Sequence, residues 1–433
     1  MSEATTSSLD LFLKTSLQTA VEDGSWVEIR PVNSIEETAP VDFHIDGTSE
    51  YFLDLANTFI KVKVRIISPD GNRGYTNDEM VAPVNLLLQA MWSKLDISFN
   101  GKRVSSSGHF YPFRSYIETI LNFGRDVKRG QLSASGFYMD TPEHFETFGA
   151  ENEGFIARKE IGVNRKAISL MGRLHSDILN QNRFLIDGVN IHLQLVRQND
   201  AFCIMRAAGH DGVNWKLKLE EVSLYVRKVK VSPSCRMGIY KALSISPAHY
   251  PIRRTEQRIF SISNNITSWS QENIIIGQLP RRLSIGFVRT DAVHGAYHLN
   301  PFLFSNLGIN FLALHMDGKQ IPSRALQPEF NGNNSDYTRT FLQMSSALGH
   351  AFTTQDCGIS YQEFKGGSTL FVFDLNAELT DGDHIEAVKR GAVRIEVRFS
   401  NALPNPVTCL LLAEYNNLIT IDKERNISLD YLV

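Results

Sequence analysis

The stretch Lys94–Gly124, KLDISFNGKRVSSSGHFYPFRSYIETILNFG, holds the pattern from which the fold can be predicted. Apolar and polar residues alternate from Leu95 to Phe99, which is typical of a β-strand with one buried face. Asn100-Gly101 follows at once, and both residue types accept the positive φ of a tight hairpin turn. Apolar residues then recur at helical spacing from Phe113 to Leu121, so a short helix is expected there.

The same plan recurs later in the chain. Ile309 to Leu314 is a strand pattern, Asp317-Gly318 matches the earlier turn, and a helical stripe runs from Tyr337 to Leu348. The order of elements holds although few identities do, which indicates two copies of one β-rich domain. Further matching segments are 369–375 with 169–174, 391–397 with 188–194, and the closing strand patterns 408–421 with 219–231.

Many short strands, few helices and frequent turn signals favour antiparallel β-sandwiches. The eight-stranded jelly roll, with two sheets over one core, is the candidate for each copy, although the pattern also fits other sandwiches. We therefore expect an all-β chain of two tandem eight-stranded antiparallel jelly rolls, with short helices in loops. The expected divisions are an N-terminal arm at 1–24, a first jelly roll at 25–234 and a second at 235–433, separated near Ser232-Pro233-Ser234.

The composition is that of an ordinary globular protein. Of its 433 residues, 42% are hydrophobic and 21% charged, and the net charge is −3. So weak a charge creates no strong field toward nucleic acid or an anionic membrane, and no apolar run is long enough to span a bilayer. The segment Met1–Ala20 is too polar for a signal peptide. The four cysteines form no C-x-x-C pair, so we expect free thiols in a reducing compartment: Cys203, Cys235, Cys357 and Cys409.

Candidate catalytic and ligand-binding motifs are weak. His175-Ser176-Asp177 has the residue types of a hydrolytic triad, but neighbouring residues on a strand point to opposite faces. His294 and His298 lack a third ligand at a fixed spacing. Gly366-Gly367-Ser368 precedes a strand instead of a helix, and no P-loop motif is present. We expect no catalytic residues, no metal site and no cofactor.

Basic and aromatic groups were weighed as contact residues. Three basic pairs are expected at solvated faces or in salt bridges between subunits: Arg253-Arg254, Arg281-Arg282 and Lys389-Arg390. Contact with phosphate is the alternative, which no stripe of interleaved aromatic residues supports. The arm has one lysine and no arginine before Asp23, too few for packaging RNA. Loop aromatics are candidates for subunit contacts, with packing inside one subunit as the alternative. They are Phe110, Tyr111, Phe113, Tyr297, Phe302 and Phe304.

Six segments spread over nearly the whole chain carry a family resemblance. They are Ser8–Phe12, Tyr51–Arg65, Pro83–Asn85, Val226–Pro233, Gly277–Arg282 and Asn300–Phe302. As a set they resemble the major capsid protein of Polinton/Maverick elements and adintoviruses, within the lineage that includes adenovirus hexon. The resemblance implies two upright jelly rolls, three chains in a pseudo-hexagonal capsomer, and no enzymatic activity. It also implies penton and minor capsid proteins as partners.

From pattern and resemblance together, we expect a non-enzymatic major capsid protein. It would form homotrimeric, pseudo-hexameric capsomers in the icosahedral shell of a DNA virus or virus-like transposon. It would be made in the host cytoplasm or nucleus, without sequence-specific nucleic-acid binding, and its apolar arm residues Leu9 to Leu13 would clip onto a neighbour. The alternatives are a lectin-like tandem β-sandwich that binds glycans, and a hydrolase whose triad comes from scattered residues.

Overall fold

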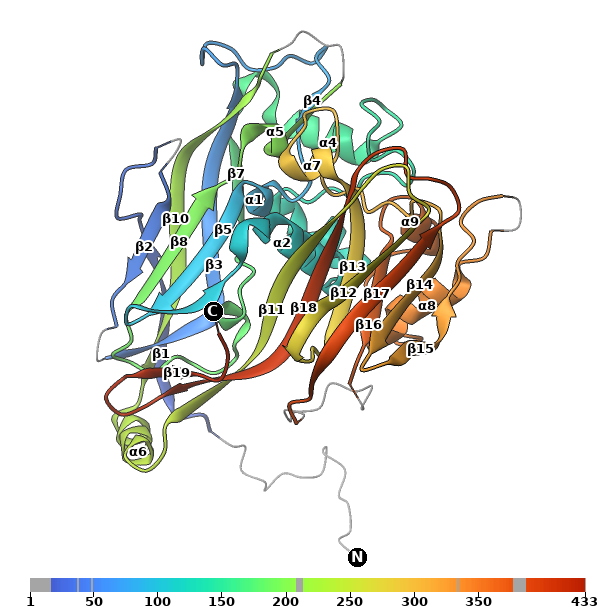
Figure 1. The fold of residues 1–433 in the computed structure, drawn as a ribbon. Helices are drawn as coiled ribbons and strands as arrows, with labels where there is room; N and C mark the ends of the chain where they lie inside the picture. The colour runs from blue at the N-terminus through green and yellow to red at the C-terminus, as the bar shows by residue number, and fades with distance from the viewer. Residues whose placement is uncertain are drawn as a thin grey trace, which may run out of the picture.

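Two β-sandwiches stand side by side in the chain, with helices between and beside them (Figure 1). The computed structural model describes residues 17–36, 39–47, 50–207, 213–332, 335–376 and 387–432. Strands before Ser232 build the two sheets of the first sandwich, and strands after Leu243 build the two sheets of the second.

The first sandwich consists of two four-stranded antiparallel sheets. In spatial order the first sheet contains β1 (Val21–Ile29), β10 (Lys216–Val231), β3 (Tyr51–Ile67) and β7 (Ile168–Arg173). The second contains β2 (Val41–Ile45), β8 (Ile191–Arg197), β5 (Trp92–Phe99) and β6 (Lys102–Ser106).

The second sandwich has the same construction. Its first sheet contains β11 (Ala248–Ile262), β18 (Val407–Ile421), β13 (Arg282–Arg289) and β16 (Leu370–Asp374), with β19 (Ile427–Leu429) beside β18. The other sheet contains β12 (Ser268–Gln278), β17 (Arg390–Phe399), β14 (Ile309–Met316) and β15 (Lys319–Leu326).

The strand order is that of a jelly roll in both halves. Counted along the chain within each half, one sheet has the order first, eighth, third, sixth, and the other has second, seventh, fourth, fifth. This count leaves aside β4 (Val81–Pro83) and β9 (Ile204–Arg206), which pair with each other. The expected duplication is therefore confirmed, and so is the all-β, tandem jelly-roll class.

The two hairpin turns that suggested the duplication have the same backbone. Asn100 and Gly101 have φ of 47° and 80°, and Asp317 and Gly318 have φ of 48° and 79°. Two successive positive φ values match the right-handed twist of the flanking strands, so each turn joins its hairpin without splaying it. A short local pattern thus specifies equivalent β5–β6 and β14–β15 hairpins.

Helices are short and lie outside the sheets. α2 (Tyr111–Asn122) and α8 (Thr338–Ala347) follow the equivalent hairpins, as predicted from the apolar spacing. α6 (Pro233–Leu243) joins the two halves, with the Ser232 hydroxyl accepting from the Cys235 amide at its start. The others are α1 (Leu87–Ala90), α3 (Arg125–Arg129), α4 (Glu153–Gly162), α5 (Asp200–Cys203), α7 (Thr290–His294) and α9 (Tyr361–Lys365), with the 3-10 turns Gly108–Phe110, Gln131–Ser135, Val163–Arg165 and Ile178–Asn180.

The chain's N-terminal region enters the fold earlier than the sequence suggests. β1 begins at Val21 and pairs with Val231 at the end of β10, so the last residues of the expected 1–24 arm belong to the sheet. The apolar run at residues 9–13 lies outside the described residues. Among the described residues, no helix has the length and apolar character needed to cross a bilayer.

Candidate functional site

In the sheet β11–β18–β13–β16, β13, β16 and the first half of β18 are buried on both faces, whereas the edge strand β11 is partly exposed. Leu411 on β18 faces the interior of the second sandwich, whereas its neighbours Leu410 and Leu412 belong to the hydrophobic core that continues into the first half. Ile117 of α2 lies opposite these two leucines. A continuous apolar run from Cys409 to Ala413 is therefore required, since no residue of this segment meets water.

Aromatic side chains fill the contact between the halves, which we call the seam. Tyr116 of α2 stacks on Phe302 of the second half, with ring centroids 4.2 Å apart and planes 4° apart. Phe113 and Phe202 meet the same ring edge-on, at 6.0 and 5.9 Å between centroids. Phe302 is 1% exposed, so contacts within one chain already cover its ring and leave almost no surface for another subunit.

This packing corrects the expectation that the loop aromatics contact other subunits. Tyr111, Phe113, Phe302 and Phe304 are buried, and the first two lie in α2 instead of a loop. The alternative, packing inside one subunit, holds for them. The physical reason is that the loop after α7 lies against α2, which no local pattern of either segment indicates.

Asn300 positions that loop. Its fully buried amide donates to the Asp140 carboxylate at 3.2 Å and to the Phe145 carbonyl at 3.1 Å, both in the first half. Its backbone amide donates to Glu146 at 3.2 Å. Since buried polar groups are costly without partners, these bonds select one position for the loop.

A buried charged cluster lies beside the aromatic contact. The Arg114 guanidinium donates to the carboxylates of Asp177 at 2.6 Å and Glu118 at 2.8 Å, and all three side chains are almost completely buried. Asp177 also accepts from the backbone amide of Thr255, at 3.0 Å, on β11 of the second half. The cluster therefore ties α2 to both sandwiches.

The environment shifts the pKa values of these groups in opposite directions. Burial would raise the pKa of Glu118, but the Arg114 guanidinium and the bond to His175 outweigh it and lower that pKa to about 2. Burial raises the pKa of Asp177, and Arg114 offsets only part of this effect. Glu118 is thus held as a carboxylate far below neutral pH.

We expect Glu118→Gln to lower the free energy of unfolding most at neutral pH and least in acid. The folded pKa of Glu118 lies below the unfolded value of 4.5, so its contribution is complete above pH 4.5 and is lost as pH falls toward 2. The shift corresponds to a contribution on the order of 3 kcal/mol. Urea titrations of both proteins at pH 7, 5 and 3 measure the difference. The exposed Glu160→Gln is the matched control, and a difference that does not shrink with falling pH would contradict this assignment.

The three side chains of the His175-Ser176-Asp177 motif are adjacent in sequence but do not bond to one another. The His175 Nδ1 meets the Glu118 carboxylate at 2.7 Å, the Ser176 hydroxyl donates to Ser105 at 3.0 Å, and Asp177 holds Arg114. The side chains diverge to separate partners, and the hydroxyl does not meet the imidazole. This geometry supports the expectation that the motif is no triad.

Further polar bonds close the lower part of the seam. Arg425 donates to the Asp187 carboxylate at 2.9 Å and to its carbonyl at 2.6 Å. Lys128, 2% exposed, donates to the carbonyls of Ile120 at 2.7 Å and Cys357 at 2.6 Å, and burial lowers its pKa to about 8. The Arg425–Asp187 and Lys128–Cys357 bonds each join the two halves, so the seam has polar as well as aromatic contacts.

A glycine allows a close approach between the halves. Gly367 has a φ of 140°, and a Cβ there would lie 2.5 Å from a ring carbon of Phe145 in the first half. The glycine pattern 366–368, weighed as a phosphate-binding loop, thus has a packing role. The Gly366 carbonyl accepts from the Glu143 amide at 2.7 Å, which adds to this contact.

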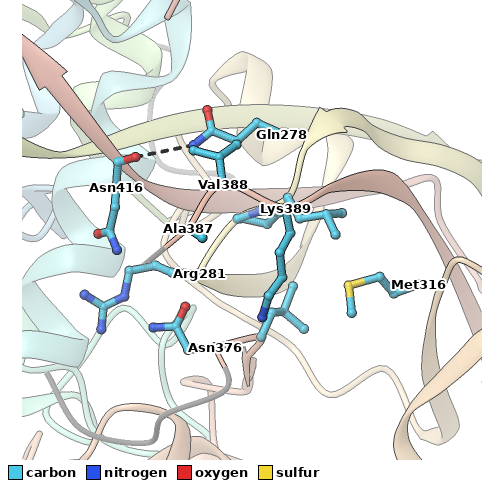
Figure 2. Close-up of a pocket in the computed structure, with 11 residues that line it drawn as sticks. Gln278, Arg281, Met316, Asn376, Ala387, Val388, Lys389 and Asn416 are labelled. Atoms are coloured by element: carbon cyan, nitrogen blue, oxygen red, sulfur yellow. Dashed lines mark hydrogen bonds between the residues drawn. The ribbon is translucent and has the colours of Figure 1, made fainter. Parts of the chain in front are cut away.

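One cavity of the second sandwich is too small to be a ligand site. The cavity in Figure 2 lies at one end of the second sandwich, between Arg281, Lys389 and Met316, and holds about 40 Å³. The Gln278 amide donates to the Asn416 carbonyl at 3.4 Å along its wall (Figure 2). So small a volume accommodates about one water molecule and no organic ligand.

The structure also shows where the histidine pair, the basic pairs and the cysteines lie. His294 ends α7 and His298 follows in a loop, both exposed, and no cluster of metal-ligating side chains occurs within the described ranges. Arg254 and Arg282 are buried and form salt bridges inside the chain, with Glu256 and Glu414, instead of the solvated faces or subunit salt bridges expected for the basic pairs. The Arg254 guanidinium bonds Asn417 at 2.9 Å, and Arg282 bonds the Ala347 carbonyl at 3.1 Å. The described cysteines are all free thiols.

Comparison with solved structures identifies the architecture. A chain of the Sputnik virophage structure matches with a TM-score of 0.64 at 13% identity, covering 100% of this chain and 94% of that one. The Faustovirus major capsid protein matches with 0.60 at 8% identity, covering 94% and 92%. The chain has the double jelly-roll fold of viral major capsid proteins. The mavirus major capsid protein shares this double jelly roll, with a TM-score of 0.56 at 10% identity, covering 97% of this chain and 92% of that one.

Sequence comparison finds a relative in an animal. An uncharacterized protein of Caenorhabditis elegans is 23% identical over 427 residues, which cover 96% of this chain and 99% of that protein. No protein-family model matches the chain. The alignment spans nearly the full length of both proteins, so the sequence similarity covers both halves of this chain.

Proposed function

We propose that this protein is a major capsid protein, a non-enzymatic building unit whose homotrimers tile an icosahedral shell. The observation that carries the proposal is the repeated strand order in one chain, together with the polar and aromatic seam between the repeats. Each subunit would contribute two similar sandwiches, so a trimer would contain six. Six similar units suit positions of local six-fold symmetry in a shell. The domain division at residues 234 and 235 is part of this proposal.

The likeness to capsid structures supports the role. Proteins named as major capsid proteins match more than nine-tenths of this chain and of their own length. The near-neutral net charge of −3 fits a shell filled by a separate packaging motor instead of one condensed on nucleic acid by basic arms. Neighbouring capsomers, penton proteins and minor capsid proteins are the expected partners in the virion.

The origin within this class is proposed from two observations. Six segments of the chain resemble the Polinton/Maverick and adintovirus capsid proteins, and the full-length relative is a nematode protein. Both support a virus-like transposon or an adintovirus as the source. Assembly in a reducing compartment agrees with the free thiols.

The test is the oligomeric state of the purified full-length chain. Size-exclusion chromatography with light scattering is expected to give three times the chain mass of 48.8 kDa. Electron micrographs of concentrated samples are expected to show pseudo-hexagonal particles or shells. A strict monomer at all concentrations, or a monomer that binds glycans on an array, would overturn the proposal.

A further inference from the structure

An apolar groove lies at the base of the first sandwich, where the chain enters it. It holds about 390 Å³ and is lined by Phe52, Phe184 and Ile186 of the first half together with Ile239 of α6 and Tyr250 of β11. This volume lies within the range of sites that bind organic ligands or peptide side chains. Ile239 and Phe184 remain partly exposed in it, so the groove is open to an occupant.

Helix α6, which lines the groove with Ile239 and protrudes at the lower left of Figure 1, also carries an exposed apolar side chain. Met237 on this helix is 72% exposed, and Ile245 just beyond it is 83% exposed. Leu243 is the helix residue that is buried. Large contiguous apolar surfaces are unusual on a free monomer and mark sites of association.

The first described residues of the N-terminal region lie beside this groove. Ala20 and Val21 line the groove, and the Ala20 carbonyl accepts from the Ser232 amide at 2.8 Å. Residues 1–16 lie outside the described part of the chain, and they contain the apolar run Leu9-Asp10-Leu11-Phe12-Leu13. An apolar segment and an open apolar groove thus belong to one chain and lie close along it.

Charge is also complementary. Residues 1–13 carry Glu3 and Asp10 and no basic side chain. Arg183 lines the groove and is exposed, and Lys241 is exposed on α6. A carboxylate between two leucines can therefore stay at the basic rim while the leucines enter the groove.

The occupant is expected to come from a second copy. Residues 17–20 are exposed, with Leu17 at 87%, so the chain leaves the body at this point. The connection Lys14–Ala20 contains no Gly, Pro, Asn or Asp, and Ser16 belongs to the weaker turn-forming types. A fully extended connection of six residues, the length of Lys14–Thr19, can span roughly 20 Å.

We propose that Leu9–Leu13 of one copy docks in the groove between Phe184 and Ile239 of a second copy, linking subunits of the shell. This inference rests on the proposed capsid function and adds to it a specific subunit contact. The docked segment would bury its apolar side chains and leave Asp10 beside Arg183.

Cross-linking tests which chain occupies the groove. Cys235 lines the groove and is partly exposed, whereas Cys203, Cys357 and Cys409 are buried. Ser8→Cys adds a thiol next to the apolar run without removing any of it. A short bismaleimide is expected to join the two thiols between chains, giving covalent dimers and larger species in denaturing gels. These species should vanish when Cys235→Ser is added.

Each other result counts against the docking. A link between the same two thiols within one chain, seen as a cross-linked peptide in the monomer band, would place the arm in its own groove and overturn the proposal. Links that persist with Cys235→Ser would join arm to arm and overturn it too. If light scattering shows trimers but no link reaches Cys235, the docking fails while the capsid function stands. A strict monomer overturns both.

Matched variants measure the strength of the contact. Leu11→Glu with Phe12→Glu should raise the concentration for half-maximal assembly by at least about tenfold, since each side chain loses its burial. Ser7→Glu with Ser8→Glu adds the same charge outside the apolar run and should have a much smaller effect. On the groove side, Ile239→Glu should act like the arm variant, and Met237→Glu on the same helix should act less. Equal effects of test and control variants would overturn the proposal.

Discussion

Arg114→Met should lower the free energy of unfolding by about 3–5 kcal/mol, because it removes the cation between two buried carboxylates. Asp177 and Glu118 would stay buried without their common partner, and Asp177 already has a raised pKa through burial. Methionine keeps much of the side-chain volume, so the loss is electrostatic and not a cavity effect. Urea unfolding followed by tryptophan fluorescence at pH 7 measures it.

The control is Arg324→Met, at an exposed position on β15, which should change stability by less than about 0.5 kcal/mol. A double variant makes the assignment sharper. Asp177→Asn removes one of the two carboxylates left without Arg114, and its amide oxygen can still accept from the Thr255 amide. The substitution should therefore lower the free energy of unfolding less in the Arg114→Met background than in the unchanged protein. Additive effects would show that the two side chains do not form one unit.

Phe302→Ala should cost about 3–5 kcal/mol and should loosen the seam between the sandwiches. The ring is 1% exposed and is contacted by three aromatic rings of the first half, so its removal leaves a cavity between rigid elements. Trimer formation should weaken as well, since the two sandwiches would no longer be held in one orientation. Denaturant unfolding and light scattering on the same preparations measure both effects.

Phe352→Ala makes the same chemical change at a side chain that is 94% exposed and should leave stability unchanged within about 0.5 kcal/mol. Similar losses for the two variants would mean that the seam contributes no more than the surface. A stable Phe302→Ala protein that forms normal trimers would show that the seam does not set the orientation of the sandwiches.

The sequence is most informative where structure is local. The turns Asn100-Gly101 and Asp317-Gly318, the alternation along β5 and β8, and the stripe of α2 follow from residue type and spacing. Their recurrence in the same order predicted the duplication before any pairing of strands was known. The strand order within each half is the tertiary feature that confirms it.

The seam was not predictable in the same way. Arg114 and Glu118 are four residues apart on α2, beside its apolar stripe, and this pair is the one local signal of the cluster. Asp177 and Thr255 join it from distant parts of the chain. For Phe302 the sequence left subunit contact and packing inside one subunit both open, because a loop aromatic gives no sign of which surface will cover it.

By itself, the sequence determined that this chain is a duplicated, mostly β protein with two equivalent hairpins and helices, because turns and side-chain periodicity depend on near neighbours. The tertiary structure alone decided that the outer face of one sheet is buried under α2, that three charges meet beneath it, and that an open apolar groove lies at the root of the N-terminal segment. Those features depend on which distant surfaces exclude water from each other, and that choice is made only when the two sandwiches pack together.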